Sequence, residues 1–191
     1  MSRRHRQAVV IAVTVVRVPL AALAAGLLHV AGAGSAAAWT VFGLLLAVEL
    51  TDMSDGILAR RWGVVSRFGE LLDPYCDSVS RLITHFGLAA GGLAPWWLLL
   101  VMALRDVSVS YIRIKCILDG RKVAARLSGK LKAIVQGTAA SVLVLSLAVR
   151  PLAESEHVGL LRGAAVGLVA AVTCWSLLDY FVAAVRPRPA A

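Results

Sequence analysis

Six long apolar segments, separated by short polar connections, constrain this chain more than any other feature of its sequence. A membrane helix needs about 20 mostly apolar residues to cross ~30 Å of hydrocarbon. Segments of about that length cover residues 8–31, 39–61, 68–93, 96–118, 128–149 and 160–185. We therefore predict an all-α integral membrane protein, a bundle of six transmembrane helices that forms a single domain over residues 1–191.

The composition excludes most other classes. Hydrophobic residues make up 59% of the chain and charged residues 16%, whereas soluble domains have roughly 45–50% and about 25%. A soluble globular protein and a disordered chain are both excluded on this basis. The three cysteines, Cys76, Cys116 and Cys174, are widely spaced and form no C-x-x-C pair, so the chain has no zinc knuckle and no motif for redox exchange.

The basic residues predict the orientation in the membrane. The net charge is +9, and the Lys and Arg residues lie mostly between the apolar segments or near their ends. One side collects Arg3, Arg4, Arg6, Arg60, Arg61, Arg67, Arg121, Lys122, Arg126, Arg186 and Arg188, and the other has Arg150 and Arg162. Basic residues favour the cytoplasmic side, so we expect both termini in the cytoplasm, in a plasma or inner membrane. This distribution also argues against nucleic-acid binding. Arg17 interrupts the first segment, which favours a span over a cleaved signal peptide.

Acidic residues are concentrated where charge is most costly. Six of the eleven fall between positions 49 and 77, in or beside the second and third apolar segments, and such groups are usually functional. On a helix, Asp52 and Asp55 share one face, and so do Asp73 and Asp77. The connection between the two segments is short, so the helices pack antiparallel. We expect the two acidic faces to oppose each other near the cytoplasmic surface.

Four carboxylates this close repel one another unless positive charge lies among them. Sites made only of oxygen ligands suit Mg²⁺, Mn²⁺ or Ca²⁺, and two metals that share carboxylates suit phosphoryl transfer. Gly56, Ala59 and Gly69 on the same faces let a ligand approach the backbone, and Arg60 supplies a cation for a phosphate. The sequence therefore predicts a metal–diphosphate site. For the other acidic residues we favour helix caps or surface charges; these are Glu49, Glu70, Asp106 and Asp179.

These residues also form a known signature. The pattern Asp52-x-x-Asp55-Gly56-x-x-Ala59-Arg60, eight residues, Gly69-x-x-x-Asp73-x-x-x-Asp77 resembles that of the CDP-alcohol phosphotransferase (CDP-alcohol phosphatidyltransferase) family at every fixed position. The length and the six predicted spans are also similar to that family.

The resemblance implies an activity and a set of roles. Members transfer a substituted phosphate from a CDP-linked lipid to an alcohol and release CMP. It implies that two divalent cations, Mg²⁺ or Mn²⁺, are held by Asp52, Asp55, Asp73 and Asp77, with Asp77 also the general base. It further implies that Gly56, Ala59, Arg60 and Gly69 contact the CDP-lipid and that the protein is a homodimer.

Further segments resemble those of the phosphatidylglycerophosphate synthases. Val13-Thr14-Val15-Val16-Arg17 is similar to their L-T-x-x-R segment, and Arg105-Asp106 and Gly129-Lys130-Leu131-Lys132 to later ones. This resemblance implies CDP-diacylglycerol as donor and glycerol 3-phosphate as acceptor. Ile11, Ser78 and Arg81 depart from the usual pattern, which leaves transferases that act on inositol phosphate as the alternative.

Basic residues independently indicate a phosphorylated acceptor. Arg113, Arg126, Lys130 and Lys132 gather at the cytoplasmic ends of the fourth and fifth segments. Arg113 and Lys132 lie deeper, where an unpaired cation is costly, so we expect them to bind the acceptor phosphate. Two other hypotheses remain, a divalent-cation transporter and a catalytically silent homologue. Acidic groups confined to two spans argue against the first, and the complete motif argues against the second.

Overall fold

The computed structural model describes residues 2–31, 35–119, 127–149 and 155–185. The helices in this part of the chain are α1 (Arg3–Ala31), α2 (Ser35–Arg61), α3 (Arg67–Ala90), α4 (Trp96–Leu118), α5 (Leu127–Ala148) and α7 (Val158–Val185). The prediction of an all-helical protein is confirmed for these residues, with a helix at each of the six apolar segments. The third helix ends at Ala90 rather than at residue 93, because Gly92 adopts a φ of +74°.

Four helices, α1, α2, α5 and α7, are long and apolar enough to cross a membrane. Helices α3 and α4 are of similar length, and α3 carries the motif aspartates Asp73 and Asp77. Large apolar side chains point outward on both kinds of helix; Leu100, Ile134 and Leu178 are each more than half exposed. Exposed apolar surface on this scale is typical of a protein that lies in lipid.

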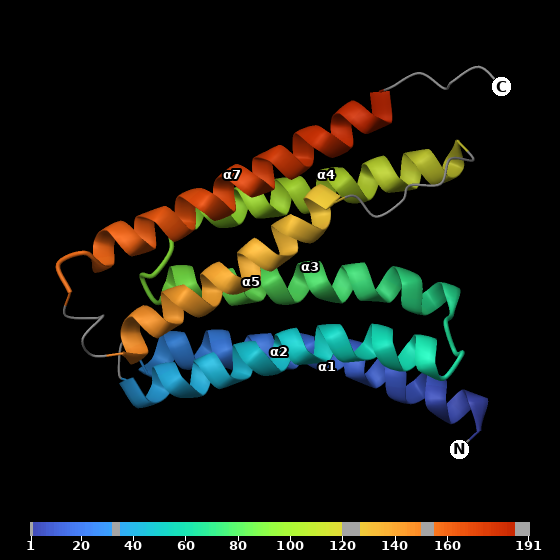
Figure 1. The fold of residues 1–191 in the computed structure, drawn as a ribbon, viewed down its shortest axis with the longest axis horizontal. Helices are drawn as coiled ribbons and strands as arrows, with labels where there is room; N and C mark the ends of the chain where they lie inside the picture. The colour runs from blue at the N-terminus through green and yellow to red at the C-terminus, as the bar shows by residue number, and fades with distance from the viewer. Residues whose placement is uncertain (1, 32–34, 120–126, 150–154, 186–191) are drawn as a thin grey trace.

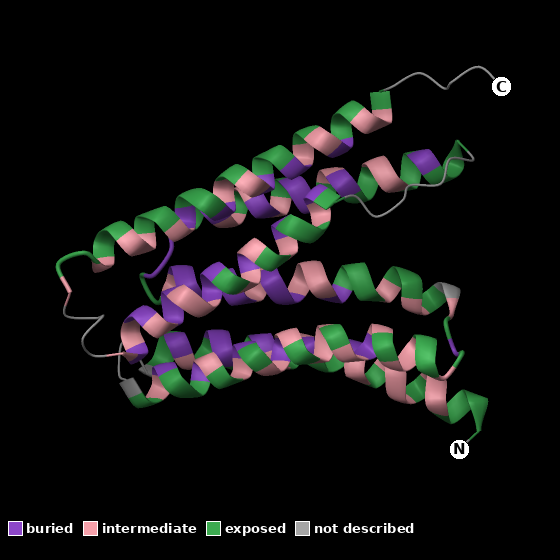
Figure 2. Ribbon diagram, viewed as in Figure 1, coloured by how far each residue is buried: buried purple, intermediate pink, exposed green. Residues whose placement is uncertain are grey.

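The helices form two groups (Figure 1). In the first, which we call the N-terminal group, α1 packs along both α2 and α3. In the second, the C-terminal group, α7 packs on α4 and α5, and α5 also contacts α2 and α3 and so joins the groups. Figure 2 shows buried residues on the faces that the helices turn toward one another. The apolar core runs through both groups and includes Val41, Leu88, Met102, Leu143 and Val169.

A tight turn makes α2 and α3 antiparallel. Gly63 has a φ of +62°, a conformation that side chains with a Cβ rarely adopt. The amide of Val64 donates to the carbonyl of Ala59 at 3.1 Å, and that of Gly63 to the carbonyl of Arg60 at 3.2 Å. This pair of bonds closes the end of α2 as a Schellman motif. The first residues after the turn then start α3, and the two acidic faces come together.

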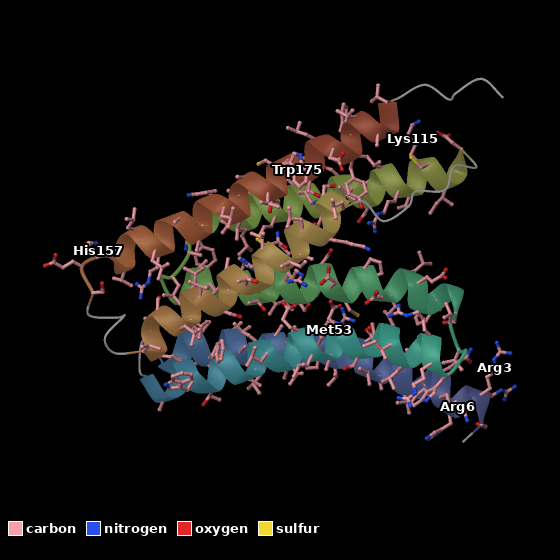
Figure 3. All side chains as sticks on the ribbon, in the orientation of Figure 1. Arg3, Arg6, Met53, Lys115, His157 and Trp175 are labelled. Atoms are coloured by element: carbon pink, nitrogen blue, oxygen red, sulfur yellow. The ribbon has the colours of Figure 1, made fainter. Side chains whose placement is uncertain are left out.

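One end of the bundle is basic. Figure 3 shows Arg3, Arg6 and Lys115 at the end of the molecule that also holds the α2–α3 turn, whereas His157 lies at the opposite end. The start of α1 and the end of α7 lie at this same basic end (Figure 1). The side that the sequence predicts to be rich in Lys and Arg therefore corresponds to one end of the folded bundle.

Candidate active site

Three aspartates from α2 and α3 converge on one arginine of α1. Arg17 is 1% exposed, and its guanidinium forms ion pairs with Asp52 and Asp55 through different nitrogens. Its Nη2 also donates to Asp73 Oδ1 at 2.9 Å. Thr14, one turn earlier on α1, donates its hydroxyl to Asp55 Oδ2 at 2.8 Å. The predicted acidic faces do oppose each other, and we call Arg17 and these three aspartates the carboxylate hub.

The fourth motif aspartate, Asp77, has a different partner. Its Oδ1 accepts a hydrogen bond from Arg81 Nε, one turn later on α3, at 2.8 Å. Asp77 still interacts electrostatically with the hub, through Coulombic repulsion with Asp52 and with Asp73. The four predicted metal ligands therefore form one electrostatic group that two arginines hold together.

The donor atoms of this group suit divalent cations, but their spacing in the described structure does not form a metal site. In the part of the chain that the structure describes, no three acidic, histidine or cysteine side chains stand close enough together to hold a metal ion, and the guanidinium of Arg17 lies between three of the aspartates. The donors are all carboxylate oxygens, which Mg²⁺ and Mn²⁺ prefer. One guanidinium neutralises only one of three charges, so the hub has negative charge left for further cations.

A cavity of about 320 Å³ lies beside the hub, between α1, α2 and α3. Its lining contains every residue predicted to contact the CDP-linked lipid and two of the predicted metal ligands, namely Gly56, Ala59, Arg60, Gly69, Asp55 and Asp73. Gln7, Ser66 and Glu70 add polar groups to the same wall. A cavity of this size with a few convergent polar groups is typical of a small-molecule site.

Small residues keep that cavity open. The amide of Gly69 donates to Ser66 Oγ at 3.1 Å, which caps the start of α3. A Cβ on Gly69 would lie 3.2 Å from the same oxygen, and a Cβ on Gly56 would lie 3.3 Å from Arg60 Nη1. Larger residues at these two positions would crowd the cap and the arginine.

The C-terminal group contains a second buried charge cluster. Asp106 Oδ1 accepts from Lys132 Nζ at 2.9 Å and from Arg105 Nη1 at 2.8 Å. Arg105 Nη2 donates in turn to Ser176 Oγ at 2.7 Å. We call Arg105, Asp106 and Lys132 the cationic cluster, because two cations share one carboxylate and all three residues are buried. The expectation that Asp106 is a cap or surface charge is wrong, since its neighbour Arg105 and Lys132 of α5 both turn inward toward it.

The structure brings two of the four predicted acceptor-binding residues into one region. Arg113 Nη2 donates to Tyr180 Oη at 2.9 Å. The guanidinium carbons of Arg113 and Arg105 each lie 5.4 Å from the centre of the Tyr180 ring, so Tyr180 links Arg113 to the cationic cluster. Lys132, within that cluster, also has a Coulombic interaction with Asp77 of the N-terminal group.

The other two predicted acceptor-binding residues are placed differently. Lys130 is exposed, and Arg126 lies outside the described residues. Of the four residues, only Lys132 is buried in the part of the chain that the structure describes.

Several partners were missed by reasoning from the sequence. Neither the pairing of Arg81 with Asp77 nor the contact of Arg81 with Glu49 of α2 was predicted. The spacing of four residues between Asp77 and Arg81 is a signal for the first pairing. The second joins different helices and has no such local signal.

Comparison with known proteins agrees with the motif. A family model described as CDP-alcohol phosphatidyltransferase matches residues 8–176. Relatives named "Probable phosphatidylglycerophosphate synthase" from two strains of Mycobacterium tuberculosis are 33% identical over 152 residues, which is 78% of this chain and 66% of theirs. The chain thus covers slightly less than two thirds of their length.

Other relatives have a more explicit name. A protein of Shigella flexneri serotype 5b named CDP-diacylglycerol--glycerol-3-phosphate 3-phosphatidyltransferase is 36% identical over 155 residues, 76% of this chain and 80% of that protein. A Bacillus subtilis protein of the same name is 34% identical over 102 residues, 53% of each chain. With a family match that extends from the start of α1 well into α7, this chain belongs to the CDP-alcohol phosphatidyltransferase family.

Proposed function

We propose that this protein transfers the phosphatidyl group of CDP-diacylglycerol to glycerol 3-phosphate and releases CMP, a step of phospholipid biosynthesis. The names of its relatives support this donor and this acceptor. The observation that carries the proposal is the cavity of about 320 Å³, because the four residues that we assign to the CDP-linked lipid line it beside three converging carboxylates.

The cavity suits a nucleotide diphosphate. Gly56, Ala59 and Gly69 carry little or no side chain, so the backbone is open to phosphate and ribose oxygens. Arg60 lies at the same wall and supplies a fixed positive charge for a phosphate. We assign these four residues to the CDP part of the donor.

We further propose that two divalent cations, Mg²⁺ or Mn²⁺, are held by Asp52, Asp55, Asp73 and Asp77. When bound, such cations neutralise the diphosphate and the charge that develops during phosphoryl transfer. Their binding competes with Arg17, which uses the same carboxylate oxygens. The surplus of negative charge at the hub supports this assignment.

Asp77 is assigned as the general base. It accepts the proton of the acceptor hydroxyl while the oxygen attacks the phosphorus attached to the lipid, and the bond from that phosphorus to CMP breaks. A carboxylate within hydrogen-bond reach can do this. Lys132 and Arg113 hold the acceptor phosphate, with Lys130 and Arg126 as further contacts. The Coulombic link between Lys132 and Asp77 supports a position for the acceptor between the two groups.

We propose that all six helices span a plasma or inner membrane, with both termini and the active site on the cytoplasmic side. The basic end of the bundle in Figure 3 supports this orientation. Labelling of single-cysteine variants Val65→Cys, in the α2–α3 turn, and Glu156→Cys, before α7, should report opposite sides of the membrane. Labelling from one side would contradict the orientation. The family resemblance further supports a homodimer.

The deciding experiment is a transfer assay with purified protein in lipid or detergent. CDP-diacylglycerol is supplied with glycerol 3-phosphate, inositol phosphate, free inositol or serine, and both CMP release and the lipid product are measured. We expect turnover with glycerol 3-phosphate. Turnover with inositol phosphate alone would keep the reaction class and change the acceptor. Absence of CMP release with every acceptor, with cation uptake into vesicles, would favour the transporter.

A further inference from the structure

A second arginine lies at the proposed base and is held by three helices. Arg81 of α3 is 7% exposed. Its Nε donates to Asp77 Oδ1 at 2.8 Å, and its Nη1 donates to Glu49 Oε1 of α2 at 3.1 Å and to the carbonyl of Ala133 of α5 at 2.9 Å. We call Arg81, Glu49 and Asp77 the Arg81 bridge. The bridge contains one cation and two carboxylates. The charge of Glu49 balances that of Arg81, so the negative charge of Asp77 is not neutralised within the bridge.

A glycine on α5 makes room for this bridge. A Cβ on Gly137 would overlap the carboxylate of Glu49, 2.9 Å from its Cδ, and would lie 3.1 Å from Arg81 Nη1. Contacts under 3.0 Å do not occur without a shift of one partner. A side chain at position 137 would therefore require the carboxylate of Glu49 to shift.

The space behind the bridge is small and has several polar groups in its wall. A cavity of about 20 Å³, lined by Glu49, Arg81, His85 and Gln136 among others, is large enough for one water molecule. Within the described residues, His85 Nε2 and Gln136 Oε1 are buried there without a hydrogen-bond partner. A shorter polar side chain at position 81 can thus be solvated, and the helices need not collapse around it.

We infer that Arg81 is a positioning residue that orients Asp77 for proton transfer. The guanidinium occupies Oδ1 of Asp77, and no other side chain of the described chain donates to Oδ2. The bridge therefore leaves one oxygen available to the acceptor hydroxyl and restricts rotation of the carboxylate. This inference rests on the proposed function, in which Asp77 is the base. By this inference, Glu49 and Gly137 also help to orient Asp77, although neither residue belongs to the family motif.

The direct test replaces Arg81. Arg81→Gln should lower kcat by about 10²-fold, the size expected for misplacement of a reacting group by ~1 Å. The KM for CDP-diacylglycerol should stay within about twofold, because neither Arg81 nor Asp77 lines the donor cavity. Arg81→Lys should recover about tenfold in kcat, since it keeps the charge but lacks the fork that reaches three acceptors. Equal kcat for wild type and Arg81→Gln, or a change in KM alone, would overturn the inference.

A glycine pair separates crowding of the bridge from general damage. Gly137→Ala keeps every charged group but pushes on Glu49 and Arg81, so kcat should fall by about tenfold. The matched control is Gly43→Ala on α2, where a Cβ would meet nothing within 4 Å, and this variant should have normal kcat. Thermal unfolding and gel-filtration profiles should match wild type for both. A Gly137→Ala protein that is folded and fully active would count against the bridge.

A double-mutant cycle distinguishes the inference from the proposal on which it rests. If Arg81 acts through Asp77, then Arg81→Gln should add less than about twofold to the loss already caused by Asp77→Asn. If the fold-losses in kcat of the two single variants multiply in the double variant, Arg81 acts independently of Asp77, for example through a structural ion pair. A normal kcat for Asp77→Asn would show that Asp77 is not the base, and the proposed function would have to change. A low kcat for Asp77→Asn together with a normal kcat for Arg81→Gln would reject only the positioning role of Arg81.

Discussion

The charge clusters of the two helix groups have opposite net sign. In the N-terminal group, three carboxylates share the guanidinium of Arg17. In the C-terminal group, Arg105 and Lys132 share the carboxylate of Asp106. Each cluster satisfies the rule that buried charges are paired, but neither is neutral.

The imbalance indicates what each group can bind. A hub with spare carboxylate charge attracts cations, and a cluster with a spare cation attracts an anion such as a phosphate. Lys132 of the cationic cluster interacts electrostatically with Asp77, which follows Asp73 of the hub by one helical turn. The proposed reaction, with a metal-bound diphosphate and a phosphorylated alcohol, requires a cation site next to an anion site, and the two clusters lie on either side of the α3–α5 contact.

Removal of divalent cations should have the largest effect and is specific to the N-terminal group. An excess of chelator should lower the rate of CMP release by more than about 10³-fold, because several kcal/mol of charge stabilisation disappear. Addition of Mg²⁺ or Mn²⁺ should restore the rate. Full activity in excess chelator would show that the negative hub serves structure alone.

Lys132→Ala tests the C-terminal group. A hydrogen bond between charged groups contributes ~1.5–3 kcal/mol, so the KM for glycerol 3-phosphate should rise by about 10–100-fold. The KM for CDP-diacylglycerol should remain unchanged, because a phosphate bound equally in ground and transition states affects only its own substrate. Lys115→Ala, at an exposed surface pair with Asp119, is the control. A loss of donor affinity alone would reassign the cluster to the donor.

Arg113→Ala should give a smaller change in the same direction. Arg113 reaches the cluster through Tyr180, so we expect the KM for the acceptor to rise by about tenfold, which is ~1.4 kcal/mol. Tyr180→Phe removes the hydroxyl and keeps the ring, and it should change this KM less than Arg113→Ala does. The reverse order would identify the hydroxyl, not the guanidinium, as the contact that matters.

Arg17→Gln should mainly change stability, and only while cations are absent. Without Arg17, three carboxylates face one another with no guanidinium between them, and each kcal/mol lost lowers Tm by about 2–4 °C in a protein of this size. Saturating Mg²⁺ should reduce the difference from wild type, because it neutralises the same oxygens. The exposed Arg4 offers the control Arg4→Gln. A Tm difference that is unaffected by Mg²⁺ would separate Arg17 from the cation site.

Local patterns in the sequence were sufficient to predict the helices and the acidic site. Apolar runs of spanning length predicted all six helices, because their signal lies within one segment. The spacing of the aspartates predicted the opposed faces, since residues three or four apart share one side of a helix. The short connection with Gly63 was enough to predict that these faces meet.

Contacts between helices far apart in sequence could not be predicted in the same way. In the sequence, Asp106 resembles a surface charge. In the fold, Lys132 of α5 binds Asp106, and Ser176 of α7 binds its neighbour Arg105. Arg17 interrupts an apolar segment, which shows that it has a role, but only the fold gives its three partners. The value of Gly137 appears only when Glu49 and Arg81 are seen against α5.

The tight turn at Gly63 also has a consequence for biosynthesis. Every residue of the carboxylate hub and of the donor cavity precedes residue 74, and α1, α2 and α3 are consecutive in the chain. These helices leave the ribosome before α4 does, and domains form from the N-terminus onward during synthesis. The N-terminal group can therefore assemble, with Arg17 already paired to its three aspartates, while the helices of the C-terminal group are still being made.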